Sequence, residues 1–208
     1  WLKKYTYSLR ENRMNRGKGD ATIATDTLSW AIASIGPEKL KEIEFDPEGI
    51  MDFAEKSCEV SVEFGGPSGK PVRVRGFDFS KARNLGRGGV ISSEWTAQMV
   101  VSYQMLSKYF ESTGEDKKSA LYREKSNLYL SELQKMIITS TSRTGQGRGC
   151  LPYASMDNVD TGHGWRTPKG SSTGSVAATA YGLFAWNGYN PFEFPESDYN
   201  KRTASNPA

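Results

Sequence analysis

Three carboxylates lie at or shortly before segments that read as helix starts: Asp26, Glu94 and Asp160. Two carboxyl groups on opposite sides of a glycosidic bond, roughly 6.5–9.5 Å apart, can hydrolyse that bond with an activated water. One of the two must carry a proton, which burial among aromatic rings can arrange. The Trp95 indole would desolvate Glu94, so we expect Glu94 to be the general acid and Asp26, between two threonines, to be the base.

Each of these acids also has a simpler interpretation. An acidic side chain in the first turn of a helix is stabilised by the positive end of the helix dipole and can serve only as a cap. Capping therefore stays open as an alternative to catalysis for Asp26 and for Glu94.

A long stretch without apolar periodicity, 151–172, holds several polar and aromatic residues. Loops of this length are uncommon in compact domains and often functional. His163, the only histidine, lies between two glycines and could bind a sugar hydroxyl or shuttle a proton, although a lone histidine is often structural. The residues that we expect to contact a ligand are Trp30, Trp95, Tyr153, His163, Trp165 and Arg166.

The aromatic content fits a carbohydrate partner. Aromatic residues make up 12% of the 208 residues, with five Trp and ten Tyr, and many stand beside polar residues. Aromatic rings with polar neighbours suit ligands that have apolar faces and hydroxyl edges, of which sugars are the commonest. The alternative is that these rings fill a helical core with their polar ends hydrogen-bonded.

Charge and hydropathy argue against two other partner classes. The chain has 27 Lys and Arg against 24 Asp and Glu, a net charge of +3, which is too small to indicate nucleic acid. The densest basic cluster is interpreted as a solvated face; it consists of Lys70, Arg73, Arg75, Lys81, Arg83 and Arg87. No run of 18 apolar residues is present, so no membrane span is expected.

We expect neither a metal nor a cofactor. Cys58 and Cys150 form no CxxC pair, which excludes a cysteine zinc site, and two free thiols are favoured over a disulfide. The segment 157–162 has closely spaced oxygen ligands but lacks the distal Glu of a calcium loop. The glycine-rich segment 145–149 lacks the ending of a phosphate-binding loop.

The hydrophobic periodicity predicts a mainly α-helical protein with one inserted β-hairpin. Helices are expected over 25–34, 46–57, 92–112, 116–139 and 173–186, and strands over 58–64 and 71–77. The short apolar helices at 28–33 and 179–184 resemble each other, and 92–97 is a looser copy. Short inner helices covered by longer amphipathic ones are typical of an α/α toroid, with a plain helical bundle as the alternative.

Three segments carry a family resemblance: TDTLSWAIASIGPE, GFDFS with ISSEWTAQM, and PYASMDNVDTGHGWRTPKGSSTGSVAATAYGLFAWNGYNPF. They resemble the closing hairpins of toroids in the six-hairpin glycosidase superfamily, most of all a bacterial group of unassigned biochemistry. The resemblance covers most of 21–194 and implies that ligands bind in a funnel at one end of the inner helices. A complete toroid has many more helices than this sequence predicts, which departs from the family pattern.

These features give three expectations of function. The first is a glycoside hydrolase acting on an oligo- or polysaccharide, the second a non-catalytic toroid that binds a glycan or serves polysaccharide assembly, and the third a helical protein-interaction scaffold.

We expect one toroid-like domain over 1–194 and a loose tail over 195–208. The chain begins at Trp1, so a missing N-terminal part of the same protein is a further expected partner. The N-terminus does not reveal the cellular location, for which an extracytoplasmic site is favoured.

Overall fold

The computed structural model describes residues 1–65, 70–81, 84–139, 148–169 and 173–193. It confirms a mainly α-helical protein with one inserted β-hairpin. The helices are α1 Leu2–Tyr5, α2 Thr25–Trp30, the π-helix η1 Ala31–Ile35, α3 Pro37–Glu42, α4 Pro47–Cys58, α5 Ser93–Ser112, α6 Asp116–Lys135 and α7 Val176–Trp186. The strands are β1 Tyr7–Ser8, β2 Arg13–Met14, β3 Glu59–Phe64 and β4 Val72–Phe77.

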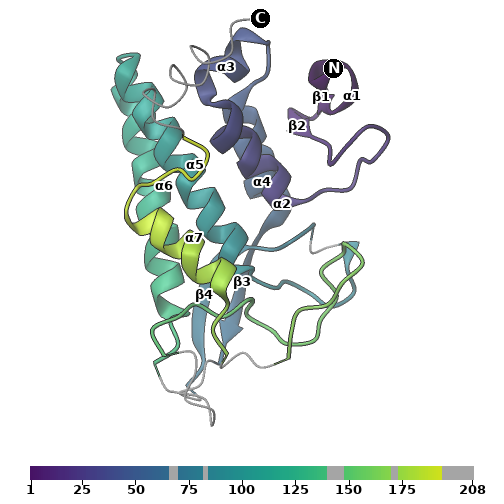
Figure 1. Ribbon diagram of the computed structural model, residues 1–208, viewed down its shortest axis with the longest axis vertical. Coiled ribbons are helices and arrows are strands. Elements are labelled where there is room, and N and C mark those ends of the chain that lie inside the picture. The colour runs from purple at the N-terminus through teal and green to yellow at the C-terminus, as the bar shows by residue number, and fades with distance from the viewer. Residues whose placement is uncertain (66–69, 82–83, 140–147, 170–172, 194–208) are drawn as a thin grey trace, which may run out of the picture.

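Helix α5 lies at the centre of the helical packing (Figure 1). It runs beside α6, to which a short turn joins it, and packs against both α2 and α7. Helix α4 covers α2 from the other side. The three segments that resemble one another in sequence therefore lie on adjacent helices, α2, α5 and α7, while α4 and α6 flank them.

The helix starts that carry the candidate acids have clear local causes. Ser92 precedes α5 and its side chain accepts a hydrogen bond from the Trp95 amide at 3.2 Å, which satisfies one unpaired helical donor. Ala24 precedes α2, and the Thr25 hydroxyl instead donates to the Asp78 carbonyl at 2.5 Å. Helix α2 continues into the single π turn η1 and ends at Gly36, whose φ of 88° suits glycine.

The predicted hairpin is confirmed as β3 and β4, an antiparallel pair in which Val62 faces Val74. It attaches beneath the start of α5, where the Phe77 amide donates to the Thr96 hydroxyl at 2.9 Å. Gly76 permits this approach, since a Cβ there would lie 2.8 Å from Ile91 and 2.9 Å from Thr96. The hairpin therefore helps to position the N-terminus of α5.

Part of the aromatic content belongs to the core. Tyr103 stacks on Tyr129 with ring centroids 5.7 Å apart and on Tyr122 at 6.1 Å, and all three are buried between α4, α5 and α6. The Tyr103 hydroxyl donates to Glu55 at 2.8 Å, and the Tyr129 hydroxyl donates to Glu59 at 3.0 Å. For these tyrosines the core interpretation is correct.

The sequence predictions missed some elements. Helix α3 begins at Pro37, where no helix was expected, and the small β1–β2 pair lies in the N-terminal segment, where no strand was expected. Helix α6 ends at Lys135 and not near residue 139, and α7 begins at Val176 and not near residue 173. The proposed tail 195–208 lies outside the described residues.

The basic cluster is largely paired with acids. Arg75 bonds Glu59, Arg73 lies 3.5 Å from Glu63, and Arg87 lies 2.6 Å from Asp78. Arg83 falls outside the described residues. Within the described part of the chain, no helix is long and apolar enough to cross a membrane.

The two cysteines are free and differ in accessibility. Cys58 is fully buried, and this burial raises the pKa of its thiol to about 12, whereas Cys150 is half-buried. Because the thiolate is the reactive species, we expect a thiol reagent to label only Cys150 in the native protein and both cysteines in denaturant. Intact-mass analysis of the labelled protein and of a Cys150→Ser control tests this, and native labelling of Cys58 would contradict it.

Candidate functional site

One pocket gathers several of the residues that the sequence singled out. Its volume is about 270 Å³, and we call it the carboxylate pocket. It is lined by Arg16, Ala24, Asp26, Thr27, Trp95, His163 and Trp165. These residues come from the N-terminal segment, the start of α2, the start of α5 and the long loop, so distant parts of the sequence meet here.

Asp26 lies in the first turn of α2 and lines this pocket. Its carboxylate accepts hydrogen bonds from the Thr27 amide at 2.7 Å and the Thr27 hydroxyl at 3.4 Å. Burial raises the pKa of Asp26, while the hydrogen bonds from Thr27 and positive charge at His163 and Arg16 oppose that rise. Asp26 thus bonds its own helix N-terminus and also presents a perturbed carboxyl group to the pocket.

Glu94 lies beside the carboxylate pocket, in the first turn of α5. Capping is done by Ser92, so Glu94 is not needed for that purpose. One carboxylate oxygen accepts a hydrogen bond from the Gln98 side-chain amide at 3.1 Å. Burial and the negative charge of Asp26 both raise the pKa of Glu94, which means that the two acids interact across the α2–α5 contact.

Aromatic rings surround the two acids. Trp95 packs edge-on against Phe79 at 4.9 Å, and Tyr153 stacks on the same ring at 5.7 Å. The Trp165 indole donates to the Tyr153 hydroxyl at 3.1 Å, and 43% of its surface remains exposed. Burial and the Glu94 charge raise the pKa of Tyr153, so this ring also lies within reach of Glu94.

Trp30 and Tyr181 approach the acids from the α2–α7 side. Their side chains are hydrogen-bonded to each other, and Trp30 is 41% exposed. Burial raises the pKa of Tyr181, and the charges of Glu94 and Asp26 add to the rise. Aromatic side chains therefore surround the two carboxyl groups, and four of them were expected to bind a ligand: Trp30, Trp95, Tyr153 and Trp165.

His163 is fixed by both ring nitrogens. Its Nε2 lies 2.8 Å from the Phe79 carbonyl oxygen and its Nδ1 lies 3.0 Å from the Arg16 guanidinium. Gly162 and Gly164, with φ of 82° and 88°, make the turn that presents the ring. Because each nitrogen already has a partner, proton shuttling by His163 does not fit this geometry.

Asp160 and Arg166 are not brought to the carboxylate pocket. The Asp160 carboxylate accepts the Gly162 amide at 2.8 Å, and the Arg166 Nε donates to the Asn158 side chain at 3.2 Å. Both residues face partners within their own loop and stabilise its turns. Asp160 was expected because it precedes a helix start, but the next helix begins only at Val176.

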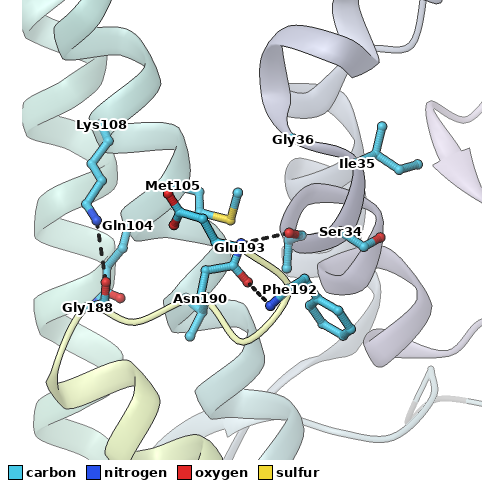
Figure 2. A pocket seen from close by; sticks show the side chains of 12 residues that line it. Ser34, Ile35, Gly36, Gln104, Met105, Lys108, Gly188, Asn190, Phe192 and Glu193 are labelled. Atoms are coloured by element: carbon cyan, nitrogen blue, oxygen red, sulfur yellow. Dashed lines mark hydrogen bonds between the residues drawn. The ribbon is translucent and has the colours of Figure 1, made fainter. Parts of the chain in front are cut away.

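A larger pocket, of about 360 Å³, lies farther along α5 (Figure 2). Gln104, Met105 and Lys108 line it on one side, with Phe192 and Glu193 on another. The acid in its lining, Glu193, lies near the end of the described chain and has no second carboxyl group beside it in the lining. We therefore place the candidate chemistry at the smaller carboxylate pocket, where titratable side chains with shifted pKa values converge.

Sequence reasoning missed Arg16, Phe79, Gln98 and Tyr181. Tyr181 stands in the internally similar segment and could have been found there, whereas Arg16 lies in a segment without periodicity.

Among the described residues, no group of three or more His, Cys, Asp or Glu side chains could hold a metal ion. Comparisons of the chain with protein-family models, curated proteins and solved structures found no significant match.

Proposed function

We propose that the protein is a carbohydrate-active enzyme of the glycoside hydrolase class, in which Glu94 is the general acid and Asp26 the general base. The observation that carries the proposal is the placement of these two acids in the first turns of the packed helices α2 and α5, beside an aromatic-lined pocket. Burial raises the pKa of both carboxyl groups, but Asp26 also has hydrogen bonds from Thr27 and a nearby arginine that oppose the rise. Such a difference between two neighbouring carboxyl groups assigns acid and base roles.

The surroundings support this division of roles. Burial and its acidic neighbour favour the protonated form of Glu94. Burial raises the pKa of Asp26 as well, but its hydrogen bonds from Thr27 and the Arg16 cation oppose that rise and favour the ionised form. A protonated acid and an ionised base are the states that hydrolysis needs at the start of the reaction.

We further propose that α2, α5 and α7 are inner helices of an α/α toroid, with α4 and α6 as outer helices. The order of packing supports this, because the inner candidates are neighbours and each outer candidate covers one of them. Asp26 and Glu94 then stand at the same end of adjacent inner helices, where a toroid would have its funnel.

The test of the proposed function is hydrolysis of a panel of neutral and charged oligosaccharides, followed by ¹H NMR of the newly formed anomeric proton. We expect product from at least one member with the wild-type protein and none with the Asp26→Asn/Glu94→Gln double variant. Inversion at the anomeric carbon would fit a base-activated water. No hydrolysis across the panel, with a folded protein, would reject the enzymatic proposal.

Exposed indoles beside the acids also favour a second candidate, a glycan-binding protein without catalysis. For either function, Trp165→Ala should weaken glycan binding by about threefold to tenfold, because a stacking face is lost. Isothermal titration calorimetry with a bound panel member measures this, and Trp165→Phe is the control that keeps a ring. Equal affinity of Trp165→Ala and wild type would place the ligand elsewhere.

A further inference from the structure

The contacts of His163 determine its protonation state. A carbonyl oxygen only accepts hydrogen bonds, so the Nε2 that faces the Phe79 carbonyl must carry a hydrogen. An arginine side chain only donates, so the Nδ1 that faces Arg16 must carry none. The ring is therefore the neutral Nε2–H tautomer, since a hydrogen on Nδ1 would point at the guanidinium.

Arg16 is tied to the pocket mainly by this contact. Its Nη1 donates to His163 at 3.0 Å, and its Nε lies 3.4 Å from Asp20 in a pair that is 38% and 41% exposed. An exposed ion pair of that kind fixes a side chain weakly. The half-buried imidazole, held by the main chain at its other nitrogen, is the more rigid anchor.

We propose that His163 is a neutral clamp that holds the Arg16 guanidinium at the wall of the carboxylate pocket, where the positive charge of Arg16 favours the ionised form of Asp26. His163 and Arg16 are then positioning residues for the base, which neither sequence pattern nor comparison indicated. The role for the base rests on the proposed function, whereas the clamp itself does not. A fixed cation beside a carboxylate favours its charged form.

The charged and titratable groups around Asp26 come from four elements. The negative charge of Asp26 raises the pKa of Glu94 on α5, and the charges of both acids add to the raised pKa of Tyr181 on α7. Arg16 supplies the positive charge from the N-terminal segment, where Asp20 is its other partner. His163 faces the pocket from the long loop. As the neutral tautomer it adds no charge, so that of these two groups only Arg16 is a cation beside Asp26.

The first experiment observes the His163 ring directly, because His163 is the only histidine and gives the only imidazole signals. Two-bond ¹H–¹⁵N correlation spectra at pH 7.5 should show one imidazole, as the Nε2–H tautomer with Nδ1 as an acceptor. Arg16→Ala should keep this tautomer but move the Nδ1 signal toward that of an unbonded nitrogen. A dominant Nδ1–H tautomer or an imidazolium would overturn the proposal.

The second experiment separates the two contacts of the ring. In His163→Asn the short side-chain amide can place its oxygen near the Nδ1 position, so it can still accept a hydrogen bond from Arg16. In His163→Gln the longer side-chain amide can donate to the Phe79 carbonyl, but Arg16 then has no acceptor at the Nδ1 position. We expect the Arg16 Nε–H signal to stay dispersed in His163→Asn and to collapse to the random-coil position in His163→Gln. The opposite order would contradict the clamp.

The third experiment measures the effect on Asp26 without any substrate. The ¹³C carboxyl titration of Asp26 should move to higher pH in Arg16→Gln and stay near wild type in Arg16→Lys, since lysine keeps the charge. An unchanged titration in Arg16→Gln, with the protein folded, would show that Arg16 does not keep Asp26 ionised. If these spectra agree with the proposal but no glycan is hydrolysed, the clamp stands and the proposed hydrolase function fails.

Discussion

Replacement of Glu94 by Gln should lower kcat on a glycan with an unactivated leaving group by about 100-fold to 10,000-fold, the range that general acid catalysis contributes. Gln has the same shape and can still accept the hydrogen bond from Gln98. It cannot donate a proton to the departing oxygen. Binding should change little, because Gln keeps the volume of Glu94 and its hydrogen bond from Gln98.

The assignment of the acid is tested by changing the leaving group. On an aryl glycoside or glycosyl fluoride, which needs little protonation, Glu94→Gln should recover most of the wild-type rate. Asp26→Asn should stay impaired on both substrates, since it loses the group that activates water. If Glu94→Gln is impaired equally on both, Glu94 is not the general acid.

The same substitution should affect stability in the opposite direction. The pKa of Glu94 is raised in the folded state, so its contribution to stability is fully present below the unfolded pKa and is lost as the pH rises through the folded pKa. At neutral pH the ionised Glu94 therefore costs stability, and Glu94→Gln should raise Tm there. At pH 3, where both states hold a protonated acid, the two proteins should melt alike; a lower Tm of Glu94→Gln at neutral pH would contradict the burial argument.

Local sequence signals were sufficient for most of the helical framework. Pro47 at a first helical position, Ser92 before Glu94 and alternating valines around the hairpin each encode a feature that is decided within a few residues. The misses have a different origin. Whether Pro37 ends one helix or begins another depends on the packing of Leu40, which is fully buried. Such packing against other parts of the fold is not encoded in the few residues around Pro37.

The site could be predicted only in part, for a related reason. Asp26, Glu94 and the indoles stand at helix starts or in a conspicuous loop, so residue type and position pointed to them. Arg16 reaches the pocket only because the N-terminal segment folds back over the long loop, and its partner His163 lies 147 positions away. Asp160 was misplaced because a sequence pattern shows which residues are near a helix start, but not which way a turn directs them.

The largest stability effect is expected at Asp78, whose side chain is completely buried. Its carboxylate accepts two hydrogen bonds from Arg87, at 2.6 and 2.8 Å, and one from the Val90 amide at 2.9 Å. Asp78→Ala would leave the Arg87 guanidinium, only 10% exposed, without its partner. Breaking a buried pair in this way costs about 3–5 kcal/mol, measurable as a fall in the free energy of unfolding in urea.

A matched control separates burial from charge. Glu63→Ala breaks the ion pair between Glu63 and Arg73, whose side chains are 58% and 69% exposed. This variant should lower the free energy of unfolding by at most about 1 kcal/mol. If Asp78→Ala lowers the free energy of unfolding no more than Glu63→Ala does, the buried pair of Asp78 and Arg87 does not stabilise the fold more than an exposed pair.

Asp78 also connects the framework to the carboxylate pocket. Its carbonyl oxygen accepts from Thr25 at the start of α2, and the next residue, Phe79, accepts from the His163 ring. We therefore expect Asp78→Asn, which keeps the volume, to disturb the Nε2–H signal of His163 at temperatures well below its Tm. An unchanged His163 signal in a destabilised Asp78→Asn protein would mean that this segment supports the fold but does not align the pocket.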